Sequence, residues 1–138
     1  MRKRLPPRAQ GGFTLLEIII VFVLIAGLLA FIVPKIYDQM GVAKAREAKI
    51  RLTSLVGQVE LYKLEVGKYP DSLQTLVKQP AGVDKWGGPY AKDADLKDSW
   101  GNDYRYTVPG TNGRAYDLIS LGADGKEGGD GQDRDITN

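Results

Sequence analysis

The feature that most constrains this chain is an apolar run over residues 13–33, in which only Thr14 and Glu17 are polar. As an α-helix this run would be about 31 Å long at a rise of about 1.5 Å per residue, which matches the hydrocarbon core of a bilayer, about 30 Å thick. A short leader precedes the run, and its basic residues are Arg2, Lys3, Arg4 and Arg8. Because such basic residues stay on the cytoplasmic side, the pattern predicts one membrane-spanning helix with a cytoplasmic N-terminus.

Two glycines and one acid distinguish this run from an ordinary signal sequence. Gly11 and Gly12 come before the apolar segment, whereas a secretory signal is cleaved after an apolar stretch of about 7–15 residues. A plain signal anchor accounts for everything except the order Gly-Gly-Phe-Thr-Leu-Leu-Glu over residues 11–17. An acid such as Glu17 costs about 2.5–3.5 kcal/mol on insertion scales, so it normally marks a partner or a function.

The residue inventory argues against an enzyme. The 138 residues include no histidine and no cysteine. This removes the commonest general base, the commonest transition-metal ligand and any disulfide. Because residues 1–33 are committed to the leader and the membrane, one small exported domain remains over residues 34–138.

Beyond the membrane the helix is predicted to continue. Pro34 would kink it at the end of the span without necessarily ending it. Apolar residues then recur at three- and four-residue spacing, namely Ala48, Leu52, Leu55, Val56, Val59, Tyr62 and Val66. We interpret this stripe as the face that packs on the domain's core. Gly67, followed by Pro70, predicts that the helix covers residues 13–66.

The rest of the domain is predicted to complete an α+β fold. Residues 69–77 read as a short second helix with Asp71 as its N-cap. Tyrosines and a valine alternate with polar residues over 103–108, which predicts a strand. Asn112-Gly113 predicts a turn, and the mostly apolar residues 115–121 after it predict the returning strand. A long N-terminal helix packed on a small antiparallel sheet belongs to the α+β class.

The C-terminal segment, residues 121–136, combines glycines with acidic residues. Its aspartates are Asp124, Asp130, Asp133 and Asp135. Calcium takes six to eight oxygen ligands and tolerates irregular geometry, whereas magnesium keeps its waters and suits such a loop less well. The spacing is not that of an EF-hand. Composition alone therefore leaves a calcium loop and a solvated acidic turn equally open.

The order of residues 11–17, with the basic leader and the apolar run, resembles the N-terminus of the type IV pilin superfamily. This resemblance implies that a membrane-embedded peptidase removes the leader, residues 1–12, by cutting between Gly12 and Phe13. It also implies methylation of the new amine of Phe13. In a fibre, Glu17 would be buried among apolar helices and would need a cation, for which that amine is the nearest candidate.

Further residues narrow the resemblance to the major pseudopilins of the bacterial type II secretion system. They are Tyr69-Pro70, Gly88-Pro89-Tyr90, Asp98, Trp100-Gly101-Asn102, Tyr104, Tyr106, Tyr116-Asp117-Leu118, residues 120–125, Gly128-Gly129, Asp133 and Asp135-Ile136. Ser99 and Asp103 stand where prolines are usual in that family. The resemblance implies that calcium is held in the C-terminal loop by Asp124, the carbonyl of Leu121, Asp133 and Asp135.

The resemblance implies a structural function for the chain. It would be the main subunit of a homopolymeric periplasmic fibre that drives folded proteins across the outer membrane, and it would lie in the lipid of the inner membrane before assembly. Implied partners are minor pseudopilins, an inner-membrane platform protein, a cytoplasmic ATPase and a prepilin peptidase, but no nucleic acid. Two alternatives stay open: a type IV pilin of a surface fibre, and a monomeric, membrane-tethered calcium-binding module of the envelope.

Overall fold

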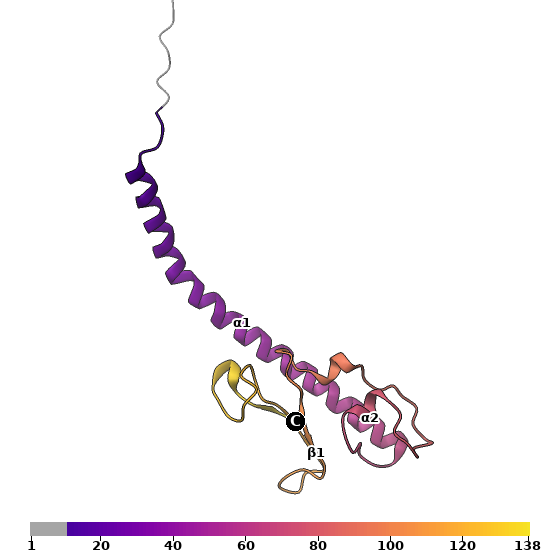
Figure 1. The fold of residues 1–138 in the computed structure, drawn as a ribbon. Coiled ribbons are helices and arrows are strands. Elements are labelled where there is room, and N and C mark those ends of the chain that lie inside the picture. The colour runs from indigo at the N-terminus through magenta and orange to yellow at the C-terminus, as the bar shows by residue number, and fades with distance from the viewer. Residues whose placement is uncertain (1–10) are drawn as a thin grey trace, which may run out of the picture. The chain divides into compact units, whose positions relative to one another are not determined.

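The computed structural model describes residues 11–138 (Figure 1). The basic residues of the leader, from which a cytoplasmic N-terminus is predicted, lie outside these described residues. The helices are α1 (Leu15–Val66) and α2 (Gln74–Val77), with short 3₁₀ segments η1 (Asp93–Leu96) and η2 (Gly131–Asp133). The strands are β1 (Arg105–Thr107), β2 (Asp117–Ser120) and β3 (Ile136–Thr137). The α+β class is confirmed.

The chain divides into two compact units, residues 1–38 and 39–138. In the first unit, every described side chain from residue 11 to residue 38 is exposed, although most are apolar. Phe22 and Phe31, for example, are 68% and 70% exposed. Among the described residues α1 is the one helix long and apolar enough to cross a membrane. Pro34 lies inside α1 and does not end it, as the sequence predicted.

In the second unit, the predicted stripe of α1 forms the centre of the core. Its residues Ala48, Leu52, Leu55, Val59 and Tyr62 are at most 1% exposed. All of these except Ala48 belong to one core cluster with residues from the rest of the domain, including Leu76, Leu96, Tyr104, Tyr116 and Leu118. Full burial of one such side chain contributes about 1.5–3 kcal/mol. The predicted C-terminus of the helix is confirmed, since α1 ends at Val66 and Gly67 follows with φ +92°.

Within the described residues the sheet has three antiparallel strands in the order β1-β2-β3. Thr107 pairs with Asp117, and Ser120 pairs with Ile136. The strands at 103–108 and 115–121 are confirmed in place, although each is shorter than predicted. β3 was not predicted, because its two residues lie in a segment that reads as an irregular loop. Their strand conformation depends on pairing with β2 across the loop.

The start of the second helix was predicted wrongly. α2 begins at Gln74, preceded by Leu73, whereas Asp71 forms a surface ion pair with Lys68 (Nζ to Oδ2, 3.1 Å). Leu73 is 8% exposed and Leu76 is fully buried. Burial of these two leucines therefore decides where the helical turn forms, over a capping preference worth about 1 kcal/mol.

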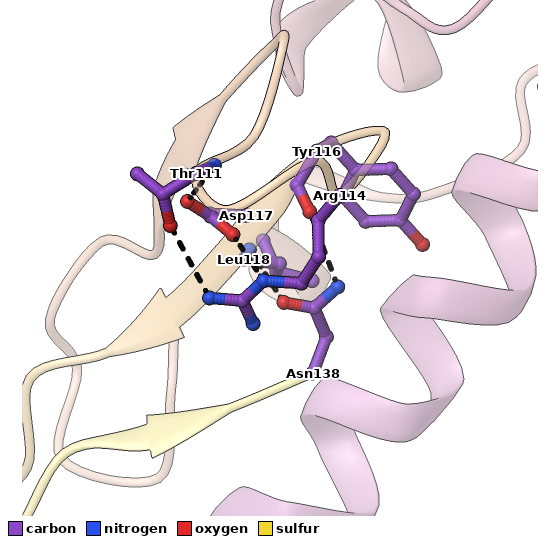
Figure 2. A network of polar contacts seen from close by, with 6 residues as sticks. All are labelled: Thr111, Arg114, Tyr116, Asp117, Leu118 and Asn138. Atoms are coloured by element: carbon purple, nitrogen blue, oxygen red, sulfur yellow. Dashed lines mark hydrogen bonds and ion pairs between the residues drawn. The ribbon is translucent and has the colours of Figure 1, made fainter.

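The connection between β1 and β2 is a longer loop than a two-residue hairpin, covering residues 108–116. Asn112 and Gly113 both have positive φ, 53° and 78°, as a type I′ turn requires. Figure 2 shows how the loop closes: the Asp117 carboxylate accepts the Thr111 N–H at 2.8 Å and pairs with Arg114 Nε at 3.0 Å. The hydrogen bond from the Thr111 N–H, with a smaller effect of the Arg114 charge, lowers the pKa of Asp117.

The last residue is tied to the middle strand. Asn138 Oδ1 accepts the Leu118 N–H at 2.9 Å (Figure 2). The Asn138 N–H donates to the Leu118 carbonyl at 3.1 Å. These bonds extend the β2–β3 ladder by one residue. They hold the end of the C-terminal loop against the core of the domain.

Candidate functional site

The start of α1 contains a reciprocal pair of hydrogen bonds between Thr14 and Glu17. The Glu17 N–H donates to the Thr14 hydroxyl at 3.2 Å, and the Thr14 N–H donates to the Glu17 carboxylate at 3.4 Å. This is a capping box, which satisfies two backbone donors that the first helical turn leaves free. This role of Glu17 was not predicted, although the pattern Thr-x-x-Glu before an apolar run is its usual signal.

The predicted cleavage site lies directly before this cap and is open. Gly12 is exposed, and Phe13 is 80% exposed. A Cβ atom added to Gly12 would meet nothing within 4 Å among the described residues. Packing within residues 11–138 therefore does not require glycine at position 12. If glycine is required there, the reason must be contact with another molecule.

The C-terminal loop folds back on itself at two glycines that face the backbone of Asp133. A Cβ atom on Gly122 would lie 2.5 Å from the Asp133 carbonyl carbon, and one on Gly129 would lie 2.8 Å from its oxygen. Both glycines also have positive φ, 68° and 88°, which other residues adopt only at a cost. The two glycines thus allow the first half of the loop to pack directly on η2.

The predicted metal ligands lie within this one loop, but their carboxylates do not converge. Asp124 Oδ1 accepts the Lys126 N–H at 3.0 Å, and Asp135 Oδ2 accepts the Gly128 N–H at 3.0 Å. Leu121 and Asp133 are half-buried. Within residues 11–138, no three acidic side chains form a cluster that could hold a metal ion. Any ion bound here would also need backbone carbonyls, which the glycine-rich loop can supply.

One oxygen in the loop stands out for its environment. Asp135 Oδ1 is buried and has no hydrogen-bond partner within the described part of the chain. Oδ2 of the same carboxylate accepts the Gly128 N–H, so only Oδ1 is left without a donor, and a buried oxygen without a donor costs about 1–3 kcal/mol. A cation is the kind of group that would satisfy this oxygen.

The loop also rests on α1. Gly41 is buried, and a Cβ atom on it would lie 3.1 Å from Gln132 Oε1 and 3.4 Å from Gln132 Cβ. Further along the helix, Lys49 Nζ donates to the Thr137 carbonyl at 2.9 Å. By helix propensity alone Gly41 is a cost of about 1 kcal/mol. Its use, which sequence reasoning missed, is to let the loop approach the helix.

Comparison with known proteins places the chain in a family. The family described as "Type II secretion system (T2SS), protein G" matches residues 35–138, and the "Prokaryotic N-terminal methylation motif" matches residues 7–33. The chain is 47% identical to the type II secretion system core protein G of Xanthomonas campestris, over 96% of this chain and 93% of the relative. The chain belongs to the protein G family of the type II secretion system.

Other members and one solved structure agree with this assignment. Core protein G of Pseudomonas aeruginosa is 43% identical over 95% of this chain and 96% of its own length. The crystal structure of the major pseudopilin from the type 2 secretion system of enterohaemorrhagic Escherichia coli matches with a TM-score of 0.52 and 27% identity. That match covers 72% of this chain and 90% of the other. The resemblance to major pseudopilins is thereby confirmed, as is the N-methylation motif. The apolar helix and the family fit a membrane-anchored subunit.

Proposed function

We propose that this protein G family member is the main structural subunit of the type II secretion pseudopilus. It polymerises into a periplasmic fibre whose growth drives folded proteins across the outer membrane. The observation that carries the proposal is the apolar half of α1, whose large side chains between Phe13 and Val33 are all at least 41% exposed. Such a surface has to be covered by lipid or by other copies of the same helix. A fibre subunit uses both, lipid before assembly and neighbouring helices afterwards.

The proposal includes a topology and a set of partners. The chain lies in the bacterial inner membrane as a single-pass protein, with its N-terminus in the cytoplasm and residues 34–138 in the periplasm. A prepilin peptidase processes it between Gly12 and Phe13, and an inner-membrane platform protein and minor pseudopilins take part in assembly. Its role is structural rather than catalytic, which agrees with its family.

Deleting and restoring the gene in its own host tests this function. We expect deletion to abolish the secreted proteins in the medium and the wild-type gene to restore them. Overproduction of the wild-type chain in the restored strain should form fibres. Electron microscopy and assays of culture supernatants measure the two effects. Surface fibres with unaffected secretion would instead indicate a type IV pilin. A chain that remains monomeric in secreting cells would indicate an envelope module.

We also propose that the C-terminal loop binds calcium. Asp124, Asp133 and Asp135 would contribute carboxylate oxygens and Leu121 its carbonyl, with Asp130 as a further candidate. Two observations support the fit: the buried, unpaired Oδ1 of Asp135 among the described residues, and the glycines that fold the loop onto η2. Bound calcium would neutralise the acidic loop and stabilise the folded state by RT ln(1 + [L]/Kd).

Calcium should raise the melting temperature of the full-length chain in detergent. At a hundredfold excess over Kd the gain is about 2.7 kcal/mol, and each kcal/mol shifts the melting temperature of a domain of about 100 residues by roughly 4–8 °C. Magnesium should do much less, and Asp124→Ala should abolish the calcium response. Circular dichroism melts in calcium, magnesium and chelator measure this.

Asp84→Ala, which removes an exposed acid outside the loop, is the matched control and should keep the full response. Asp130→Asn, Asp133→Asn and Asp135→Asn would then identify the remaining carboxylate ligands. Identical wild-type melting temperatures in calcium and in chelator would mean that the loop is a solvated acidic turn.

A further inference from the structure

A turn far from the C-terminal loop in sequence supports the place where that loop begins. The turn comprises Asp98 to Asn102, and its first residue is a buried carboxylate, 3% exposed. Asp98 Oδ1 accepts the N–H groups of Trp100 at 3.0 Å and Asn102 at 2.9 Å, and the Asp98 N–H donates to the Asn102 carbonyl at 2.9 Å. These bonds hold the backbone of Asn102 in one conformation.

The same carboxylate reaches β2. Asp98 Oδ2 accepts the hydroxyl of Ser120 at 2.6 Å, and Ser120 is fully buried. Ser120 is the last residue of β2 and directly precedes Leu121. Asp98 therefore joins the turn to the strand end from which the C-terminal loop departs. Because Asp98 is buried and both of its carboxylate oxygens accept hydrogen bonds, it fixes the turn and the end of β2 relative to each other.

Asn102 extends the connection into the loop itself. Its side-chain Nδ2 donates to the Gly122 carbonyl at 2.8 Å. The N–H of the same peptide group, that of Ala123, donates to the Gln132 carbonyl at 2.9 Å. One peptide group is thus held on both sides, by the turn and by η2.

This peptide group lies between two of the proposed calcium ligands. Leu121 precedes it and Asp124 follows it, while its N–H bond reaches the segment that carries Asp133. Fixing this peptide group restricts the backbone that carries Leu121 and Asp124 and holds it against the segment that carries Asp133. Ordering a backbone has an entropic cost, so residues that are already ordered before the ion arrives add no such cost to binding.

We infer that Asn102 is a positioning residue for calcium binding by the C-terminal loop, an inference that rests on the proposed calcium site. The hydrogen bond from Asn102 to the Gly122 carbonyl holds the Leu121–Asp124 segment against η2. Asp98 in turn holds the backbone of Asn102. Asn102 acts through the loop's backbone and is not itself a ligand. Groups that orient metal ligands typically change metal affinity about 10–100-fold when they are removed.

The test is the calcium affinity of the full-length chain in detergent, measured by isothermal titration calorimetry. Asn102→Ala should weaken the Kd for calcium about 10–100-fold. Asp103→Ala is the matched control from the neighbouring position. Asp103 is 80% exposed and pairs with Lys97 at 2.8 Å on the surface, where ion pairs contribute little. The Kd of Asp103→Ala for calcium should therefore stay within about twofold of wild type.

A purely structural role gives a different result. In that case Asn102→Ala would lower the melting temperatures in chelator and in calcium equally and leave the Kd unchanged, which would overturn the inference. Should Asn102→Ala fail to fold, Asn102→Leu retains the approximate volume without the donor and has to show the same loss of affinity. A wild-type chain that binds no calcium would refute the calcium site itself, and the inference with it.

Discussion

Replacing Gly12 by Leu is expected to leave the whole population of the chain as an unprocessed inner-membrane precursor. In the wild type, the mature chain should begin at Phe13 and carry a methyl group on its amine. Gly12 is exposed, and the described structure leaves open space around it. A side chain there would therefore meet the peptidase rather than this chain's own core. Intact mass of the membrane-extracted protein distinguishes precursor, cleaved chain and methylated chain.

A second glycine serves as the control for this substitution. Gly27 lies inside α1, and a Cβ atom there also meets nothing within 4 Å in residues 11–138. Gly27→Leu should therefore be cleaved and methylated like the wild type. Wild-type protein that retains residues 1–12 in cells with active peptidase would contradict the proposed processing.

Replacing Glu17 by Val or Gln is expected to weaken fibre assembly strongly while leaving insertion and cleavage normal. In an assembled fibre the carboxylate would be buried among apolar helices, where an ion is tolerated only with a partner. The new Phe13 amine, of the same or a neighbouring subunit, is the proposed partner. A hydrogen bond to a charged group contributes about 1.5–3 kcal/mol, which corresponds to a roughly tenfold to hundredfold loss of association. Sheared-fibre yield relative to membrane-bound chain measures the effect.

The capping box supplies controls that separate charge from helix capping. Glu17→Gln keeps a side chain that can cap the helix start but removes the charge, whereas Thr14→Ala removes the capping hydroxyl and keeps the charge. If the charge is what matters, Glu17→Gln should assemble poorly and Thr14→Ala nearly normally. Wild-type fibre yield from Glu17→Val would indicate that the carboxylate only reaches out to the membrane surface.

Much of the fold follows from local patterns in the sequence. The stripe from Ala48 to Tyr62 could be placed on the core because helical periodicity depends on nothing beyond the helix itself. The helix end at Gly67 could be placed because positive φ is a property of glycine. Neither feature needs a partner that lies far away in the chain.

The predictions that were wrong or missing concern contacts between distant segments. The start of α2 depends on the burial of Leu73 and Leu76 against the core, which outweighs the capping preference of Asp71. β3 exists because Ile136 pairs with Ser120. Such pairings depend on which segments the fold brings together, and residue propensities do not encode that.

The candidate sites divide in the same way. The sequence alone determined the apolar run, the proposed cleavage position before Phe13 and the loop in which the acids gather, because each is a contiguous pattern of charge, size or hydropathy. Only the tertiary structure placed Gly41 under Gln132 and Asn102 against Gly122. The residues of each contact are 20 or more positions apart in the chain. They form only after the core has brought α1, the Asp98 turn and the C-terminal loop together, so no local pattern in the sequence could have revealed them.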